Sequence, residues 1–286
     1  MTDKARGRVV LVTGSSSGFG LLAALAFARL GDVVYATVRS EIGRQRLLEA
    51  AAAERVEVRP LMVDVTNLES LDEAVDLIIA EHAAVDVAVN NAGVACSGAI
   101  ETIRFSTLRL VWETNFFAPL RLIRRVLPGM RVRRRGHIVN VSSMSGRLPA
   151  QPITWSYDTT KHALGAMSEA LAHEVAPFGI IVRCIEPAFF RTDILKNKFR
   201  EVEETGVLQH SPYVDAERAV EGWIARQVAG SADPGPVIEA IVAASEASDS
   251  WPVHVPVGAT VEEELARVHE LDEAGYAREL RREFGL

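Results

Sequence analysis

Short apolar runs alternate with stretches of helical periodicity along most of the 286-residue chain. The first run, residues 9–12, is apolar at every position, which is typical of a strand with both faces buried. Further strands are predicted at 33–38, 56–63, 85–89, 137–141 and 180–185, and helices at 21–28, 42–54, 67–83, 106–133 and 155–176. Strands that alternate with helices predict an α/β fold, a doubly wound parallel sheet with helices on both faces in three α/β/α layers.

One domain is expected to span residues 1–286, because no linker, shift in composition or internal repeat divides the chain. The alternation breaks at about 188–232, a long connection that contains the aromatic residues Phe189, Phe190, Phe199, Tyr213 and Trp223. Long connections inside a compact α/β domain are often lids, so we predict a substrate-lid insertion here. Alternatively, the aromatic side chains only pack the insertion onto its own base. The remaining predicted elements are a helix near 234–247, a strand at 251–256 and a polar helical tail from Thr260.

The formal net charge of −7 argues against binding to nucleic acid or to an anionic membrane. The basic run 121–135 lies toward the end of a predicted helix, where the helix dipole favours cations, and is interpreted as a solvated face. No apolar run is long enough to span a membrane, and the first residues lack the apolar centre of a signal peptide. Cys96, Cys184 and the seven histidines form no metal-binding pattern. We therefore expect a cytoplasmic protein without a metal site.

A glycine-rich turn, Thr13-Gly-Ser-Ser-Ser-Gly-Phe-Gly20, follows the first predicted strand and precedes a helix. In that context Gly14 permits the tight turn, Gly18 lets the backbone approach a pyrophosphate, and Gly20 allows close packing of the helix. The amides and dipole at the helix N-terminus then favour an anion. The sequence predicts a dinucleotide site that includes Gly14, Ser16, Ser17, Gly18, Phe19 and Gly20.

The end of the second strand, Thr37-Val38-Arg39, bears on the choice of cofactor. An acidic residue there accepts from a ribose 2′-hydroxyl, whereas arginine accommodates a 2′-phosphate. Arg39 can make a bidentate phosphate contact, and no carboxylate occurs before Glu41. The prediction is NADP(H) in preference to NAD(H), with NAD(H) still possible.

Tyr157 and Lys161 are four residues apart on a predicted helix and share a face. With four tyrosines and four lysines in the chain, such a pair is expected by chance only about 0.06 times. An ammonium beside a phenol is expected to lower the phenol pKa toward neutrality and to make Tyr157 a general acid and base. Ser142 and Ser143 end the strand before this helix, and one of them is expected to hydrogen-bond the reacting oxygen. The spacing Ser-Ser-x-x-Gly favours Ser143, with Ser142 as the alternative.

In this order along the chain, the motifs resemble those of the short-chain dehydrogenase/reductase family, which has a Rossmann-like fold. The resemblance covers nearly the whole chain, and the run 34–39 is most similar to the hydroxysteroid and retinol dehydrogenase-type branch. It departs from the family pattern at Ala188, where glycine is usual, and at Thr160, where serine is common.

The resemblance also implies roles that the spacing alone does not give. It places Asp64 and Val65 near the adenine, and Pro187 and Thr192 beside the nicotinamide carboxamide. It implies that Lys161 contacts the ribose hydroxyls and that Asn115 holds a water that relays protons. The segment expected to line the cofactor and brace the fourth strand is Asn91, Ala92 and Gly93.

Together the motifs predict an oxidoreductase that interconverts a ketone or aldehyde with an alcohol, with Asn115, Ser143, Tyr157 and Lys161 as the catalytic residues. The aromatic insertion favours a lipophilic substrate, and analogy favours a homodimer or homotetramer. One alternative is a non-catalytic dinucleotide-sensing regulatory protein, although a sensor need not retain an acid. Another is a sugar-nucleotide epimerase, which the glycine spacing and the lack of a substantial C-terminal substrate domain disfavour.

Overall fold

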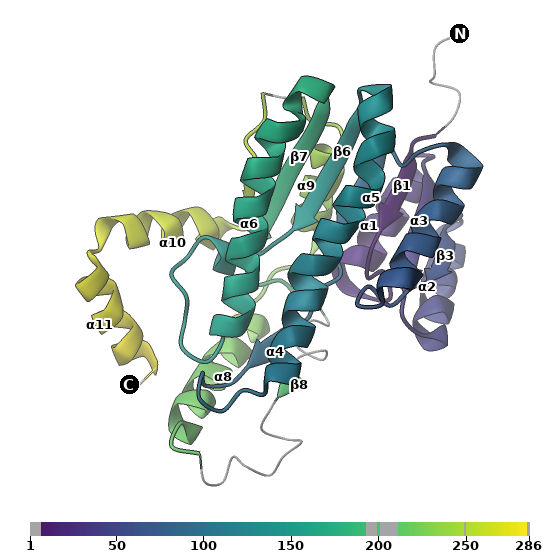
Figure 1. The fold of residues 1–286 in the computed structure, drawn as a ribbon. Helices are drawn as coiled ribbons and strands as arrows, with labels where there is room; N and C mark the ends of the chain where they lie inside the picture. Colours follow the sequence, from purple (N-terminus) through teal and green to yellow (C-terminus); the bar gives the residue numbers. More distant parts are fainter. Residues whose placement is uncertain (1–6, 193–198, 201–210, 249, 285–286) are drawn as a thin grey trace.

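A computed structural model describes the chain except for residues 1–6, 193–198, 201–210, 249 and 285–286 (Figure 1). Its main feature is a seven-stranded sheet in which every adjacent pair is parallel, in the order β3-β2-β1-β4-β6-β7-β9. The strands are β1 (Val9–Val12), β2 (Val33–Val38), β3 (Arg59–Met62), β4 (Val87–Asn90), β6 (Gly136–Val141), β7 (Ile180–Pro187) and β9 (His254–Val257). The predicted doubly wound, Rossmann-like sheet is confirmed.

Helices cover both faces of this sheet (Figure 1). One apolar core lies between the sheet and α1 (Gly18–Arg29), α2 (Glu41–Glu54) and α9 (Gly235–Ala244). The other lies between the sheet and α3 (Leu68–His82), α5 (Ala118–Arg133) and α6 (Trp155–Val175). Two cores on opposite faces explain why the central strands are apolar at nearly every position.

The long helix predicted at 106–133 is three pieces in the structure. Helix α4 (Phe105–Trp112) leads into a π-helical turn, Glu113–Phe117, which is followed by α5. Periodicity cannot distinguish this turn, because one wider turn preserves an apolar face on each side of it. Its consequence is local: Asn115 is buried within the widened turn.

The C-terminal third differs most from the sequence prediction. The last strand is 254–257 rather than 251–256, and the polar tail forms two helices, α10 (Ala259–Glu270) and α11 (Glu273–Phe284). The predicted insertion contains a two-residue strand, β8 (Phe199–Arg200), paired with β5 (Cys96–Ser97), and the helix α8 (Val214–Ala229). Figure 1 shows α11 returning toward α8, below the main sheet.

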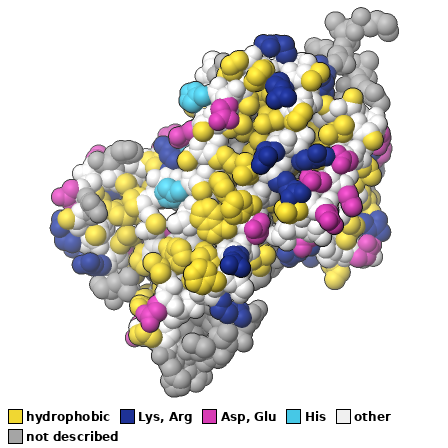
Figure 2. Space-filling view, in the orientation of Figure 1, with side chains coloured by type: hydrophobic (Ala, Val, Ile, Leu, Met, Phe, Trp, Pro, Cys, Tyr) yellow, Lys and Arg dark blue, Asp and Glu magenta, His cyan; other side chains and the backbone are white. Residues whose placement is uncertain are grey.

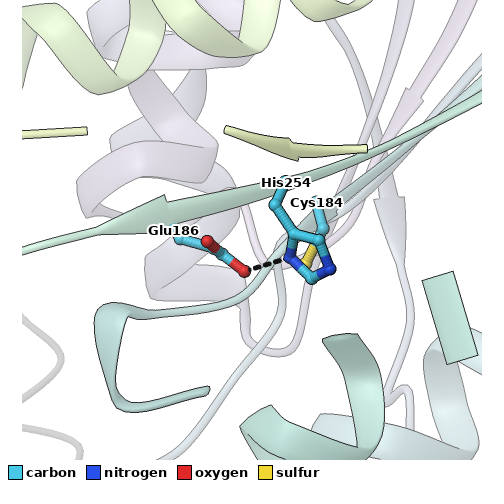
Figure 3. A group of neighbouring side chains, drawn as sticks. All are labelled: Cys184, Glu186 and His254. Carbon is cyan, nitrogen blue, oxygen red and sulfur yellow. Dashed lines mark hydrogen bonds and ion pairs between the residues drawn. The ribbon is translucent and has the colours of Figure 1, made fainter. Parts of the chain in front are cut away.

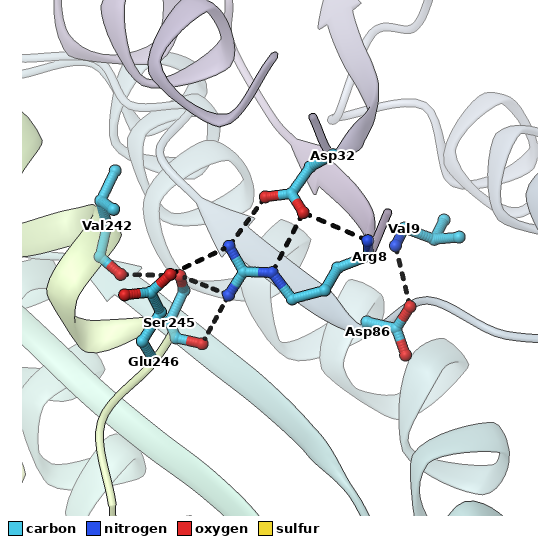
Figure 4. Close-up of polar contacts among 7 residues, drawn as sticks. All are labelled: Arg8, Val9, Asp32, Asp86, Val242, Ser245 and Glu246. Carbon is cyan, nitrogen blue, oxygen red and sulfur yellow. Dashed lines mark hydrogen bonds and ion pairs between the residues drawn. The ribbon is translucent and has the colours of Figure 1, made fainter. Parts of the chain in front are cut away.

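A charged cluster closes the amino ends of the first two strands (Figure 4). The Arg8 guanidinium donates to both Asp32 carboxylate oxygens, at 3.1 and 2.7 Å, and to the Ser245 carbonyl at 3.0 Å. Asp86 accepts from the Val9 amide at 2.8 Å. These contacts join β1, the start of β2 and the end of α9, and they leave the carboxyl ends of the strands for a binding site. None of the helices in the described ranges is long and apolar enough to cross a membrane.

Candidate active site

A cavity of about 490 Å³ opens at the carboxyl ends of the strands, around the point where the strand order reverses between β1 and β4. Open α/β sheets bind ligands in this crevice, outside the strand ends. Most of the predicted site residues line it: Gly14, Ser16, Ser17, Gly18, Phe19, Arg39, Asp64, Val65, Asn91, Ala92, Gly93, Ser143, Tyr157, Lys161, Pro187 and Thr192. Gly20 and Asn115 are not among the lining residues.

The glycine turn is shaped by close backbone contacts. Gly14 has φ +71°, and a Cβ there would lie 2.7 Å from the Ala92 Cα atom. A Cβ on Gly20 would lie 2.3 Å from the Gly14 carbonyl oxygen, so Gly20 packs beneath the turn rather than lining the cavity. Gly18 has φ +57° and faces Thr192, whose Cβ would be 3.4 Å from an added Cβ. The turn therefore presents bare backbone at the start of α1, a geometry suited to a phosphate.

Asn91 braces the turn from β4. Its side-chain amide donates to the Thr13 and Gly14 carbonyls at 2.9 and 3.1 Å, and its backbone amide donates to the Thr13 hydroxyl at 3.0 Å. The buried Thr37 hydroxyl accepts from the Gly14 amide at 3.0 Å. Thr37 therefore supports the glycine turn through this hydrogen bond. The glycine motif alone does not predict this contact.

Arg39, Asp64 and Val65 lie at the opposite end of the cavity from Tyr157 along the sheet edge, after β2 and β3. The Arg39 side chain is exposed at the cavity rim. One Asp64 carboxylate oxygen accepts from the Thr66 amide and hydroxyl, at 3.0 and 2.7 Å. These bonds fix the carboxylate in the cavity wall.

Tyr157, Ser143 and Lys161 converge at the other end. Lys161 is buried, its ammonium lies 5.5 Å from the centre of the Tyr157 ring, and it donates to the Val141 carbonyl at 3.0 Å. A side-chain hydrogen bond joins Ser143 to Tyr157. The Ser142 hydroxyl instead donates to the Lys161 carbonyl at 3.2 Å. Of the two candidate serines, Ser143 is the one placed beside the phenol.

The ionisation of these groups differs from the sequence-based expectation. Burial raises the pKa of Tyr157 to about 12, and the Ser143 hydrogen bond only partly offsets this rise. Burial also lowers the pKa of Lys161 to about 8. Lys161 is therefore not sufficient to lower the pKa of the Tyr157 phenol, because burial disfavours the charged forms of both side chains.

Asn115 lies behind the cavity wall and links three elements. Its amide nitrogen donates to the Val94 carbonyl and the Thr160 hydroxyl, both at 3.0 Å, and its oxygen accepts from the Val94 amide at 2.9 Å. Both amide hydrogens are thus used within the protein. The structure assigns Asn115 a bracing contact with the segment after β4, next to Gly93 and Lys161.

Sequence reasoning missed several cavity residues, including Asp158, Ile224 and Val228. Asp158 is buried beside Tyr157, accepts from the Gln151 amide and the Thr154 hydroxyl at 3.0 Å each, and has a pKa that burial raises to about 6. Its position next to the tyrosine was visible in the sequence. Ile224 and Val228 on α8 were not, because the register of a helix in an irregular insertion is not fixed by periodicity alone.

Aromatic side chains of the predicted insertion divide between two places. Phe190 packs against Phe19 at a ring distance of 6.1 Å and belongs to a main core. Phe189 packs against Trp223 at 5.4 Å, and Trp223 in turn packs against Phe284 of α11 at 5.7 Å. Phe189, Phe190 and Trp223 all line the cavity, and Phe190 also packs in the core between the sheet and α1. Leu195, which the sequence also suggests as a lid residue, lies outside the described residues.

This fold and this cavity define a dinucleotide-dependent oxidoreductase of the doubly wound α/β class. The sequence profile of the short chain dehydrogenase family matches residues 8–203, and the chain belongs to this family. The resemblance inferred from the motifs is confirmed, and NAD(P)-dependent dehydrogenase or reductase activity follows from it.

Two curated relatives and one solved structure illustrate the likeness. The 3-ketodihydrosphingosine reductase of Bacteroides thetaiotaomicron is 38% identical over 213 residues, which cover 73% of this chain and 72% of the relative. Retinol dehydrogenase 8 of Homo sapiens is 38% identical over 188 residues, covering 64% of this chain and 59% of the relative. A short-chain dehydrogenase from Streptomyces avermitilis matches in structure with a TM-score of 0.80 and 33% identity, over 98% of this chain and 96% of that one.

Proposed function

We propose that the protein is an NADP-preferring oxidoreductase that interconverts a lipophilic ketone or aldehyde with its alcohol, with Tyr157 as general acid and base. The observation that carries this proposal is the convergence of Tyr157, Ser143 and Lys161 at one end of the cavity that begins at the glycine turn. An acid, a second donor and a cation at the end of a dinucleotide crevice are the groups that carbonyl reduction needs.

A nicotinamide cofactor bound along the glycine turn would supply the hydride for reduction of the carbonyl carbon. Tyr157 gives its proton to the carbonyl oxygen, and the Ser143 hydroxyl donates a hydrogen bond to the same oxygen as negative charge develops there. Lys161 stabilises the phenolate that remains, because its ammonium lies 5.5 Å from the centre of the Tyr157 ring. Asn115 keeps the Val94 segment and Thr160 in register behind the site. A water held near Asn115 would return the proton from solvent.

NADP preference rests on Arg39. It is the exposed cation at the cavity rim after β2, where Thr37 is committed to the glycine turn and Val38 is buried. A 2′-phosphate at this rim would meet a guanidinium and no carboxylate from β2. NAD(H) would lack that contact and bind more weakly.

A lipophilic substrate is favoured by the wall opposite the cofactor end. Phe189, Trp223, Ile224 and Val228 give this part of the cavity an apolar lining. The two curated relatives are named for a ketone of a sphingoid base and for retinol, both lipid-like molecules. We infer an elongated apolar substrate whose carbonyl reaches Tyr157 while its hydrocarbon part contacts the lid helix α8.

A second copy of the chain is the proposed partner. Figure 2 shows hydrophobic side chains gathered over the face that carries α4, α5 and α6. Trp112, Phe116 and Phe117 form an aromatic cluster there, with ring distances of 5.3–6.3 Å, and Phe105 and Phe117 are exposed. Exposed apolar patches of this kind mark interfaces, and a patch of adjacent helices suits a two-fold contact. The two buried free thiols fit a reducing cytoplasm.

The function is tested by following NADPH oxidation with a panel of short ketones, long-chain ketones, steroid ketones and polyene aldehydes. Wild-type protein, Tyr157→Phe protein and an enzyme-free sample are compared. Turnover by the wild type alone supports the proposal. NADPH binding without turnover of any carbonyl, together with no alcohol oxidation in the reverse assay, would favour the dinucleotide-sensing alternative.

A further inference from the structure

A chain of alternating charges lies behind the catalytic end of the cavity, on the side of the sheet that faces α6. His254 on β9 pairs with Cys184 on β7 in the strand register, and Figure 3 shows its ring directed at Glu186. The two ring nitrogens contact carboxylates on opposite sides, Nδ1 with Glu186 and Nε2 with Glu169, each at 2.5 Å. Arg147 donates to the other Glu186 oxygen at 3.3 Å.

These contacts define an ion-pair network. Cys184, Glu186 and His254 bring three possible metal-binding atoms within 4.8 Å of one another. However, each imidazole nitrogen is engaged by a carboxylate, which favours the imidazolium cation, and a metal would have to displace the Nδ1 proton. The order of charge is then Arg147 positive, Glu186 negative, His254 positive and Glu169 negative. Glu186 is only 1% exposed, so its charge depends on these neighbours.

The network joins the segments that carry the proposed catalytic groups. Arg147 follows the 3-10 turn Met144–Gly146, which begins directly after Ser143. Glu186 precedes Pro187 at the end of β7, and Pro187 and Ala188 line the cavity. Glu169 lies about two turns beyond Lys161 on α6. One buried carboxylate is therefore shared by the serine turn, the end of β7 and, through His254, the helix of the catalytic pair.

We propose that His254 is a positioning residue whose positive charge holds the Glu186 carboxylate in place, and with it the Ser143 turn and the Pro187–Ala188 segment. This inference rests on the proposed function, because it concerns the geometry of that active site. Among the residues that the structure describes, removing the cation leaves the buried Glu186 with the longer Arg147 contact as its ion pair. A buried charge without a close partner drives rearrangement or protonation. The serine turn and the end of β7 are the parts expected to shift, since Arg147 and Glu186 belong to them and both border the cavity.

The test compares His254→Gln, which removes the charge, with His254→Arg, which keeps a cation that can reach Glu169 and Glu186. We expect His254→Gln to lower kcat about tenfold while NADPH affinity changes less than about threefold, and His254→Arg to stay within about threefold of wild type. The double variant Glu186→Gln/His254→Gln should have a kcat at least about threefold higher than that of His254→Gln, because it also removes the unpaired charge of Glu186. Thermal unfolding identifies any variant that is not folded.

Two further measurements keep the inference separable from the proposed function. Amide hydrogen exchange of the NADPH-bound proteins should show faster exchange at 143–147 and 187–189 in His254→Gln, a readout that does not require turnover. The inference is overturned if His254→Arg is as impaired as His254→Gln, or if exchange at these segments is unchanged. It is also overturned if a chelator reproduces the effect of His254→Gln in the wild type, which would make the cluster a metal site. If the wild type is inactive but the exchange still differs between wild type and His254→Gln, the proposed function is wrong and the positioning role of His254 stands.

Discussion

At the scale of single residues, burial controls the groups on which the proposed chemistry depends. Tyr157 has a pKa raised to about 12 and Lys161 one lowered to about 8, both because their charged forms lose water. A phenol that stays protonated is suited to giving a proton to a carbonyl oxygen, while its later recovery needs the Lys161 cation and the oxidised cofactor nearby. The same desolvation strengthens each electrostatic contact inside the site.

Replacing Tyr157 should therefore abolish most of the turnover and leave NADPH binding nearly unchanged. Tyr157→Phe is expected to lower kcat at least about a hundredfold, because the phenol hydroxyl is the proposed proton donor, with NADPH affinity changed less than about threefold. Steady-state kinetics and a fluorescence titration of NADPH measure the two effects. Tyr213→Phe is the matched control, since its hydroxyl contacts Glu101 and Tyr213 does not line the cavity. Near-normal turnover in folded Tyr157→Phe protein would contradict the mechanism.

Cofactor choice depends on one exposed side chain. A charge-assisted hydrogen bond to a phosphate is worth roughly 1.5–3 kcal/mol, or about ten- to a hundredfold in affinity. We expect NADPH to bind more tightly than NADH by about this factor, and Arg39→Ala to remove most of the difference. Titration of both cofactors into both proteins measures it, with Arg44→Ala as control because Arg44 is bonded to Glu41 on α2. A preference that survives Arg39→Ala would rule out this role.

At the scale of elements, the sequence predicted the parts of the molecule that repeat a simple pattern. Strands such as Val9–Val12 are apolar throughout because both faces are buried, and the glycine turn has a fixed chemistry, so both were predictable. The π-helical turn at Asn115 and the contact between α11 and α8 were not. Each depends on tertiary packing between segments far apart in the chain, which local periodicity does not encode.

The contact between α11 and α8 bears on specificity. Trp223 on α8 lines the cavity, and it is held by an edge contact with Phe284 and by a 2.6 Å hydrogen bond from its indole to Glu283. Helix α10 packs with Val261 against Met144 and Leu148, on the loop after Ser143. The C-terminal helices thus support both sides of the proposed substrate region, a role that their polar sequence did not indicate.

Removal of this indole should weaken binding in proportion to the length of the substrate. Trp223→Ala is expected to raise KM for long-chain ketones about tenfold or more, since burial of a large apolar side chain contributes roughly 1.5–3 kcal/mol. Short ketones should show less than about a twofold change. KM for a homologous ketone series checks this, with Trp251→Ala as control because Trp251 is exposed and does not line the cavity. Equal effects along the series would place Trp223 outside the substrate region.

At the scale of the whole molecule, the aromatic cluster on α4 and the following turn stays partly exposed in a single chain. Phe117 is 44% exposed within it. Phe117→Glu should shift the protein from dimer or tetramer toward monomer at micromolar concentration, because a charge in the centre of an apolar contact loses its hydration without gaining a partner. Light scattering coupled to size exclusion measures the mass. Ile42→Glu is the matched control, an exposed apolar residue on α2, and a monomeric wild type would exclude the proposed interface.

The stability of the fold should depend on pH through His254. Hydrogen bonds with Cys184 and Glu186, further supported by Glu169, raise the pKa of His254 to about 10 from its ordinary value of 6.5. Arg147 is the other charged group on Glu186. A pKa raised in the folded state means that the imidazolium stabilises the fold fully below about pH 6.5, and that this contribution declines as the pH rises toward 10.

The difference in unfolding free energy between wild type and His254→Gln should accordingly be largest near pH 6 and should shrink steadily toward pH 10. Urea unfolding at several pH values across this range measures it, with both proteins compared at each pH so that other titrating groups cancel. The unfolding free energy of His254→Arg should increase relative to that of the wild type as the pH rises, because a guanidinium stays charged at high pH. A gap between wild type and His254→Gln that does not change with pH would mean that His254 contributes packing but no charge to the network around Glu186.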